Sequence, residues 1–124
     1  MTEEMKKFQG TWKQIAYEKD GVKEPLDEQG WEPRVTFEGN TFIVTLAEGR
    51  IPIKGTYKLD ATREPKAMDL TDTFGEDKGK TFLAIYSLER DRMIFCAADA
   101  GQERPTEFRT RFGQVLRVHQ RETP

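Results

Sequence analysis

Residues 33–46 read PRVTFEGNTFIVTL, and this stretch decides the fold class. Apolar and polar residues alternate over Pro33–Glu38 and again over Thr41–Leu46, and Gly39-Asn40 lies between the two runs. Such alternation is typical of strands that have one buried and one solvated face. Glycine and asparagine are residue types that are common in tight turns. The stretch therefore predicts two antiparallel strands joined by a tight turn.

The same alternation recurs on both sides of this hairpin. A short helix is expected at the start, with Thr2 as its N-cap and Gly10 as its stop. A run of about nine short strands predicts a sandwich or an up-and-down barrel, and we expect the barrel because it leaves no strand edge exposed. The further strands are predicted at Thr11–Glu18, Arg50–Asp60, Ala67–Thr71, Lys80–Leu88 and Arg92–Ala98, with Thr106–Thr110 and Gln114–Arg121 as a closing hairpin around Gly113.

Length and charge limit the classes of protein that this chain can belong to. Its 124 residues suit a single domain, here residues 1–124, and 20 basic against 22 acidic residues predict no nucleic-acid partner. The longest apolar run, Met93–Ala98, is far shorter than the roughly 20 residues of a membrane-spanning helix. Met1-Thr2-Glu3-Glu4 does not have the composition of a signal peptide. We therefore expect a cytoplasmic protein, or an exported one if a leader has been removed.

Gly10-Thr11-Trp12 begins the first predicted strand directly after the predicted helix. This arrangement resembles the G-x-W signature of lipocalins, which opens the first strand of an eight-stranded barrel. The resemblance implies that the indole of Trp12 plugs the closed end of a barrel. It also implies a cation–π contact on that indole from an arginine of the last strand, either Arg117 or Arg121.

A second resemblance extends over nearly the whole chain, and several short motifs in a fixed order carry it. Together they resemble a bacterial family of lipocalin-like domains that is expanded in planctomycetes. This resemblance implies the barrel fold, and it implies no catalytic residues because the family has no assigned biochemical function. The motifs are Gln9–Lys13, Phe37-Glu38-Gly39, Gly55–Asp60, Asp69-Leu70-Thr71, Asp77–Thr81, Ile85-Tyr86-x-Leu88, Cys96-Ala97 and Glu103–Phe108.

Residues suited to covalent catalysis are few, so we expect no enzymatic activity. His119 is the only histidine, and the alternation with Leu116 and Val118 predicts that it faces solvent. Ser87 is the only serine, and it lies in mid-strand without the sequence of a nucleophile elbow. Cys96 is the only cysteine, which excludes an intrachain disulfide, and it has no base beside it in the sequence. We expect its thiol to be buried and inert.

Metal and cofactor sites are not expected either. One cysteine and one histidine are too few for a zinc site, which usually has four ligands. The acidic residues around Gly75 do not follow the spacing of a calcium-binding EF-hand loop, so a solvated loop is expected there. These acidic residues are Asp69, Asp72, Glu76 and Asp77.

The inward-facing residues form the candidate ligand site. An eight-stranded barrel is either filled by its own side chains or holds one small ligand. Two functions therefore stay open, namely non-enzymatic binding of a small apolar ligand and a protein-interaction or structural module with a filled core. If a ligand binds, Tyr57 and Tyr86 are expected to orient its polar end. The predicted ligand-binding residues are Phe37, Phe42, Val44, Ile53, Tyr57, Phe82, Tyr86, Phe95 and Phe108, and Met93 is predicted to face inward with them.

Two further segments leave alternatives open. The long connection Asp20–Glu32 carries Val22 and Leu26, and Trp31 lies near its end. It is either a lid over an open end of the barrel or a packed loop, since long loops in compact domains are often functional. Arg104–Phe108 is either a turn and strand that close the barrel or a binding element at its mouth. The sequence predicts no particular protein partner.

Overall fold

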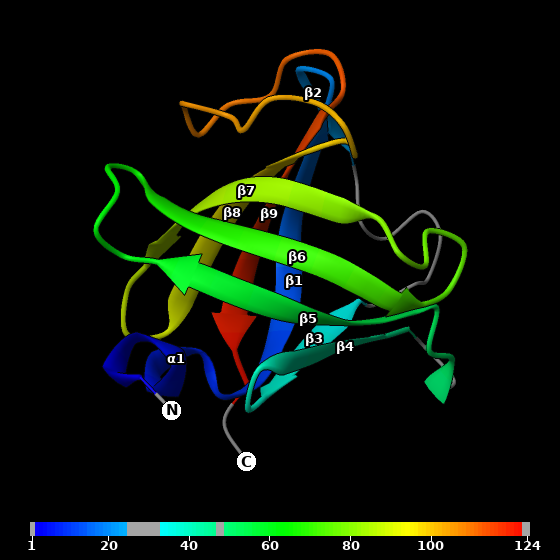
Figure 1. Cartoon of the computed structure of the whole chain (residues 1–124), viewed down its shortest axis with the longest axis vertical. Coiled ribbons are helices and arrows are strands. Elements are labelled where there is room, and N and C mark those ends of the chain that lie inside the picture. Colours follow the sequence, from blue (N-terminus) through cyan, green and yellow to red (C-terminus); the bar gives the residue numbers. More distant parts are fainter. Residues whose placement is uncertain (1, 25–32, 47–48, 123–124) are drawn as a thin grey trace.

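The structure is a computed structural model that describes residues 2–24, 33–46 and 49–122. One short helix precedes nine strands, which run antiparallel to their neighbours (Figure 1). Among the described residues, no helix has the length and apolar character needed to cross a membrane. The elements are α1 (Glu3–Phe8), β1 (Gly10–Lys19), β2 (Val22–Glu24), β3 (Arg34–Glu38), β4 (Thr41–Thr45), β5 (Ile53–Asp60), β6 (Lys66–Phe74), β7 (Thr81–Leu88), β8 (Arg92–Ala98) and β9 (Gln114–Arg121).

The sheet closes on itself because β1 pairs with β9 as well as with β3. Eight strands therefore form a closed up-and-down barrel, and β2 is an extra strand that pairs with the end of β1. The register of β1 against β9 shifts between Gln14 and Ala16, which is a β-bulge at Ile15. The predicted all-β barrel with a short N-terminal helix is confirmed.

Strand boundaries follow the sequence pattern closely, with two corrections. The predicted strand Thr106–Thr110 is wrong, because these residues form no ladder and belong to the connection between β8 and β9. Gln114–Arg121 is consequently no hairpin partner of that segment, and it pairs with β8 and β1 instead. β2 was not predicted, since the three residues Val22–Glu24 are too few to show an alternation.

Residues 99–113, here named the outer strap, pack against the outside of the barrel. The guanidinium of Arg104 donates hydrogen bonds to the carbonyl oxygens of Met68 (3.2 Å) and Ala84 (2.8 Å). The same group forms an ion pair with Asp69 at 2.6 Å. The thiol of Cys96, which is fully buried, donates to the carbonyl oxygen of Arg109 at 3.8 Å. The strap therefore covers the outer face of β6, β7 and β8.

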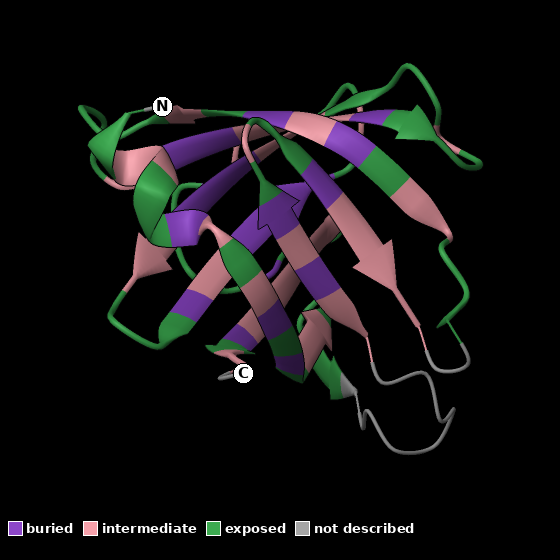
Figure 2. Cartoon of the chain, turned by 90° about the horizontal axis from the view of Figure 1, so that it is seen from below, coloured by how far each residue is buried: buried purple, intermediate pink, exposed green. Residues whose placement is uncertain are grey.

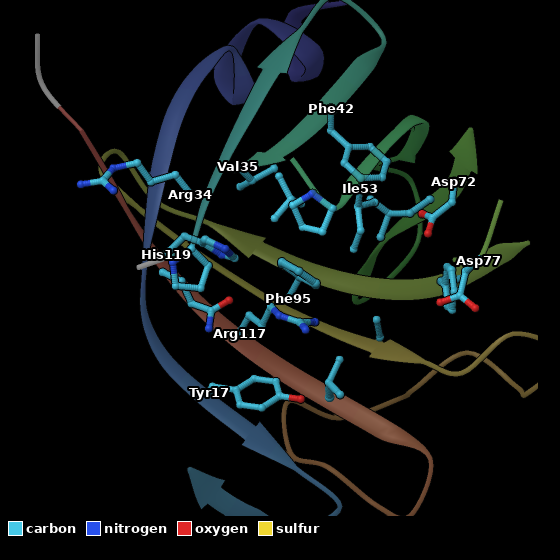
Figure 3. A pocket seen from close by; sticks show the side chains of 18 of the residues that line it. Tyr17, Arg34, Val35, Phe42, Ile53, Asp72, Asp77, Phe95, Arg117 and His119 are labelled. Carbon is cyan, nitrogen blue, oxygen red and sulfur yellow. The ribbon is translucent and has the colours of Figure 1, made fainter. Parts of the chain in front are cut away.

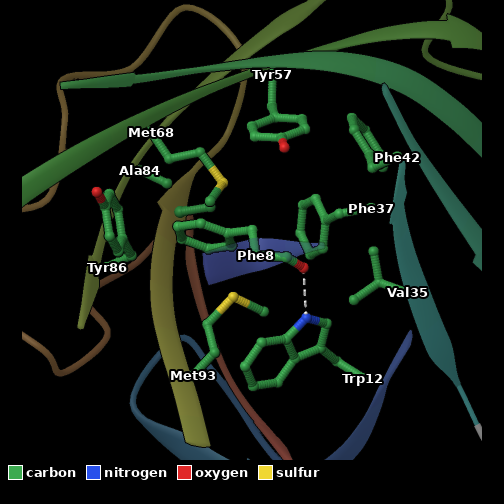
Figure 4. Packing of buried hydrophobic residues seen from close by; sticks show 11 residues of the cluster. Phe8, Trp12, Val35, Phe37, Phe42, Tyr57, Met68, Ala84, Tyr86 and Met93 are labelled. Atoms are coloured by element: carbon green, nitrogen blue, oxygen red, sulfur yellow. Dashed lines mark hydrogen bonds between the residues drawn. The ribbon is translucent and has the colours of Figure 1, made fainter. Parts of the chain in front are cut away.

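Helix α1 closes one end of the barrel (Figures 1 and 2). Thr2 caps it by accepting a hydrogen bond from the backbone amide of Met5, as predicted. Phe8, at its last turn, is fully buried and accepts a hydrogen bond at its carbonyl oxygen from the indole of Trp12 (2.9 Å, Figure 4). Arg121 lies over the Trp12 ring, 4.2 Å from its centroid. Both expectations for Trp12 are confirmed, and the arginine is Arg121.

Candidate ligand cavity

Among the described residues, a packed cluster of side chains fills the part of the barrel next to α1, and a cavity of about 600 Å³ lies beside it. Aromatic and aliphatic side chains from β3 to β8 form most of its wall (Figure 3). Gly55 lies opposite Phe42 in the ladder, and a Cβ atom at Gly55 would come within 2.6 Å of the Phe42 ring. Glycine at this position therefore lets that ring lie against β5. Six of the nine predicted residues line the cavity, namely Phe37, Phe42, Val44, Ile53, Phe82 and Phe95.

Three predicted ligand-binding residues do not line the cavity. Tyr57 and Tyr86 point inward, but they belong to the packed cluster around Phe8 (Figure 4). The hydroxyl of Tyr57 donates to the carbonyl oxygen of Gly39 at 2.7 Å, and that of Tyr86 donates to Glu4 at 2.6 Å. Their hydroxyls are thus already paired with protein groups, which argues against the predicted role in orienting a ligand.

Phe108 is the third predicted residue that does not line the cavity. It lies in the outer strap, and its side chain is 38% exposed.

Most of the predicted lid, Asp20–Glu32, lies outside the described residues, including Leu26 and Trp31. Val22 is described, and as part of β2 it is exposed.

The polar wall of the cavity comes from β9, where the predicted side-chain orientation is wrong. Met93 pairs with His119, and Phe95 pairs with Arg117. Directly opposed residues of two strands point to the same face of a sheet. Because Met93 and Phe95 face inward, His119 and Arg117 do so too, and His119 is only 3% exposed.

Arg117 carries a positive charge on the cavity wall. Its guanidinium carbon lies 4.9 Å from the centroid of the Tyr17 ring and 6.0 Å from that of Phe95. Burial lowers the pKa of the guanidinium, which nevertheless stays charged at neutral pH. In the described part of the chain, no carboxylate pairs with Arg117 and no hydrogen bond is formed by its side chain. Cation–π contacts with the ring faces of Tyr17 and Phe95 are therefore the main interactions that offset the cost of burying this charge.

His119 lies two residues further along β9, and its ring stacks on Phe95. Burial lowers the pKa of the imidazole to about 3, and the charge of Arg117 acts in the same direction. The ring is accordingly neutral at pH 7. Its Nδ1 atom is buried and has no hydrogen-bond partner among the described residues. Burying an unpaired polar atom costs free energy.

Carboxylates lie on a different part of the wall. Asp72, on β6, is 5% exposed, and Asp77 follows in the next turn (Figure 3). Burial raises the pKa of the Asp72 carboxyl to about 6, and the charge of Asp77 adds to this effect. Figure 3 shows both carboxylates across the cavity from Arg117 and His119. The cavity thus has a basic side on β9 and an acidic side at the end of β6.

The residues considered for catalysis are not brought together. Ser87 pairs with Ile94 in the ladder and points to the outside of the barrel, whereas His119 points inward. Cys96 is on the outer face under the strap, and burial raises the pKa of its thiol to about 11. The expectation of a buried thiol is confirmed. No cluster of three or more potential metal ligands occurs within the described ranges.

No protein-family model matches the chain, and no curated protein sequence matches it.

The sequence contained one signal that could have placed Arg117 and His119 in the cavity. Trp12 was expected inside the barrel, and Arg121 was one of two arginines expected to stack on it. Alternate residues of a strand share a face, so an inward Arg121 requires His119 and Arg117 to point inward as well. The apolar Leu116 and Val118 favour the opposite orientation of β9, with His119 facing solvent.

Proposed function

We propose that this protein is a non-enzymatic, lipocalin-like barrel domain that binds one small apolar ligand in the cavity. The cavity volume of about 600 Å³ carries the proposal. Sites for small molecules usually measure about 300–1,000 Å³ and combine apolar walls with a few polar groups. The walls provided by Phe42, Phe82 and Phe95, with Arg117 and His119 as polar groups, fit this description. The resemblance to bacterial lipocalin-like domains supports the barrel fold on which this function depends.

The cavity also argues against the alternative, a module whose barrel is filled by side chains. In the part of the chain that the structure describes, the buried cluster that includes Phe8, Trp12, Tyr57 and Tyr86 fills the end next to α1 and leaves the cavity open. Water in an apolar cavity makes few hydrogen bonds, and an apolar ligand that displaces it gains free energy. The barrel therefore has a packed closed end next to α1 and a cavity in which binding of an apolar ligand would be favourable.

A titration with N-phenyl-1-naphthylamine, a neutral apolar fluorophore, tests the proposal. We expect saturable binding with one site per chain and a rise in fluorescence. Val44→Trp places an indole in the cavity, and we expect it to weaken binding at least about tenfold, since each 1.4 kcal/mol of lost affinity is a factor of ten. Thr45→Trp is the matched control, because Thr45 is the next residue of β4 and points to the opposite face.

Two results would contradict the proposal. One is no saturable binding to the unmodified protein. The other is an equal loss of affinity in Val44→Trp and Thr45→Trp, which would place the fluorophore outside the barrel. Circular dichroism of both variants checks that the barrel is intact.

A further inference from the structure

We infer that the ligand is an amphiphile with a single anionic head group, such as an alkyl carboxylate, and that the head group binds Arg117. This inference rests on the proposed function and specifies the chemistry of its ligand. Its basis is a positive charge on the cavity wall that no protein carboxylate neutralises in the part of the chain that the structure describes.

A cation in such a place is costly unless it is paired. Charged groups lose hydration when they are buried, and buried charges in proteins are usually paired with an opposite charge. The other two arginines that line the cavity, Arg34 and Arg50, are either paired with a carboxylate or exposed to solvent. Arg34 forms an ion pair with Glu122, and Arg50 is exposed. Among the described residues, Arg117 contacts only the faces of Tyr17 and Phe95, which attract a cation but accept no in-plane hydrogen bonds. Its N–H groups are therefore free to donate to a ligand.

His119 provides a second donor beside this cation. His119 is only 3% exposed, and the Nδ1 atom of its imidazole has no partner within the described ranges. A neutral imidazole carries one hydrogen, which can be on Nδ1. In that tautomer His119 can donate to an oxygen of an anion that Arg117 holds, because both residues point into the cavity from the same face of β9.

The opposite wall determines the rest of the ligand. Val44, Ile53 and Phe82 offer apolar surface for an alkyl or other hydrocarbon portion. Asp72 and Asp77 border the cavity across from Arg117 and would repel a second negative charge (Figure 3). A molecule with one anionic end and an apolar body satisfies both sides of the cavity.

Competition between decanoate and 1-decanol tests this inference. The two have equal chain lengths, and each is used below its micelle concentration to displace N-phenyl-1-naphthylamine. We expect decanoate to compete at least about tenfold better than 1-decanol, because hydrogen bonds to ionised groups are the stronger ones. In Arg117→Gln this preference should disappear, whereas Arg117→Lys should retain part of it. Arg92→Gln is the matched control, since Arg92 is exposed on β8 and the charge change is the same.

The outcomes separate this inference from the function on which it rests. If the neutral fluorophore binds, but decanoate and 1-decanol compete equally, the inference is overturned and the proposed function stands. The inference is also overturned if the preference for decanoate survives in Arg117→Gln or disappears equally in Arg92→Gln. If the fluorophore does not bind to the unmodified protein, the proposed function fails first. Fluorophore binding by Arg117→Gln itself shows that this variant is folded.

Discussion

The imidazole of His119 stacks on the ring of Phe95, with centroids 5.3 Å apart and planes only 7° from parallel. This contact joins β8 and β9 inside the barrel and buries a group that is often charged below neutral pH. Burial holds the pKa of His119 at about 3, against about 6.5 for an exposed imidazole. Burial therefore keeps the ring neutral, and it links the stability of the barrel to pH.

Acidification should destabilise the protein through His119. Between pH 6.5 and pH 3 the unfolded chain binds a proton at this residue and the folded chain does not, so the free energy of unfolding decreases as the pH falls. At pH 5 the loss from this residue is about 2 kcal/mol, since one pKa unit corresponds to about 1.4 kcal/mol. Urea unfolding at pH 7 and pH 5, compared with His119→Gln, measures it.

Asp72 acts in the opposite direction and must be separated from this effect. Its pKa is raised to about 6, so the folded chain holds an extra proton between about pH 3.8 and pH 6 and gains stability on acidification. Asp72 is present in both proteins, and its contribution cancels in the comparison. The unmodified protein and His119→Gln would have parallel pH profiles if His119 were exposed.

Truncation of Trp12 should remove the plug of the closed end. Trp12 is fully buried, donates to the carbonyl oxygen of Phe8 and stacks under Arg121. We expect Trp12→Ala to lower the free energy of unfolding by about 3–5 kcal/mol, as for other buried aromatic residues. Phe112→Ala is the control, because Phe112 is 94% exposed and its loss should cost little. Trp31 lies outside the described residues, and we expect Trp31→Ala to cost much less than Trp12→Ala. Similar values for Trp12→Ala and Phe112→Ala in urea unfolding would show that Trp12 has been misplaced.

Tyr86→Phe should affect stability and leave ligand binding unchanged. The variant removes the hydrogen bond that the Tyr86 hydroxyl donates to Glu4 at the closed end. Loss of such a bond costs about 1–3 kcal/mol. Thermal unfolding and the fluorophore titration together check this prediction. A weaker affinity for the fluorophore at unchanged stability would instead assign Tyr86 to the ligand site.

Reactivity of Cys96 should report on the outer strap. The thiol is buried beneath the strap, and burial raises its pKa to about 11, so alkylation of the folded protein should be slow. Arg104→Ala removes the ion pair with Asp69 and two hydrogen bonds to carbonyl oxygens of β6 and β7. We expect faster alkylation by iodoacetamide in this variant. Arg111→Ala, an exposed residue of the same strap, should leave the rate unchanged, and equal rates in all three proteins would argue against the anchoring role of Arg104.

Local patterns were sufficient to predict the barrel. Alternation located β3 and β4 on either side of Gly39-Asn40, and the resemblance of Gly10-Thr11-Trp12 to the lipocalin G-x-W signature implied the position of the closed end. These features depend on residues that are near one another in the chain. They required no knowledge of what covers the outside of the sheet.

The candidate site was less predictable because the outer strap buries outward-facing residues, so that an apolar residue no longer indicates the inner face of a strand. On β7 and β8, Ile85 and Cys96 point outward and are still almost completely buried, since the strap covers them. Apolar residues therefore occur on both faces, and on β9 the apolar Leu116 and Val118 no longer indicate the inside. For this reason the sequence pattern predicted a solvent-facing His119. Its true position follows from pairing with β8, a contact between separate strands.

The central claim is that the ligand lies inside the barrel, and intermolecular nuclear Overhauser effects test it most directly. The measurement uses protein with ¹³C-labelled Val and Ile methyl groups and bound decanoate. Val44 and Ile53 line the cavity, whereas Ile43 and Ile94 point to the outer face. We predict Overhauser effects from the alkyl chain of decanoate to the methyl groups of Val44 and Ile53, and none to those of Ile43 and Ile94. Effects confined to Ile43 and Ile94 would contradict binding inside the barrel.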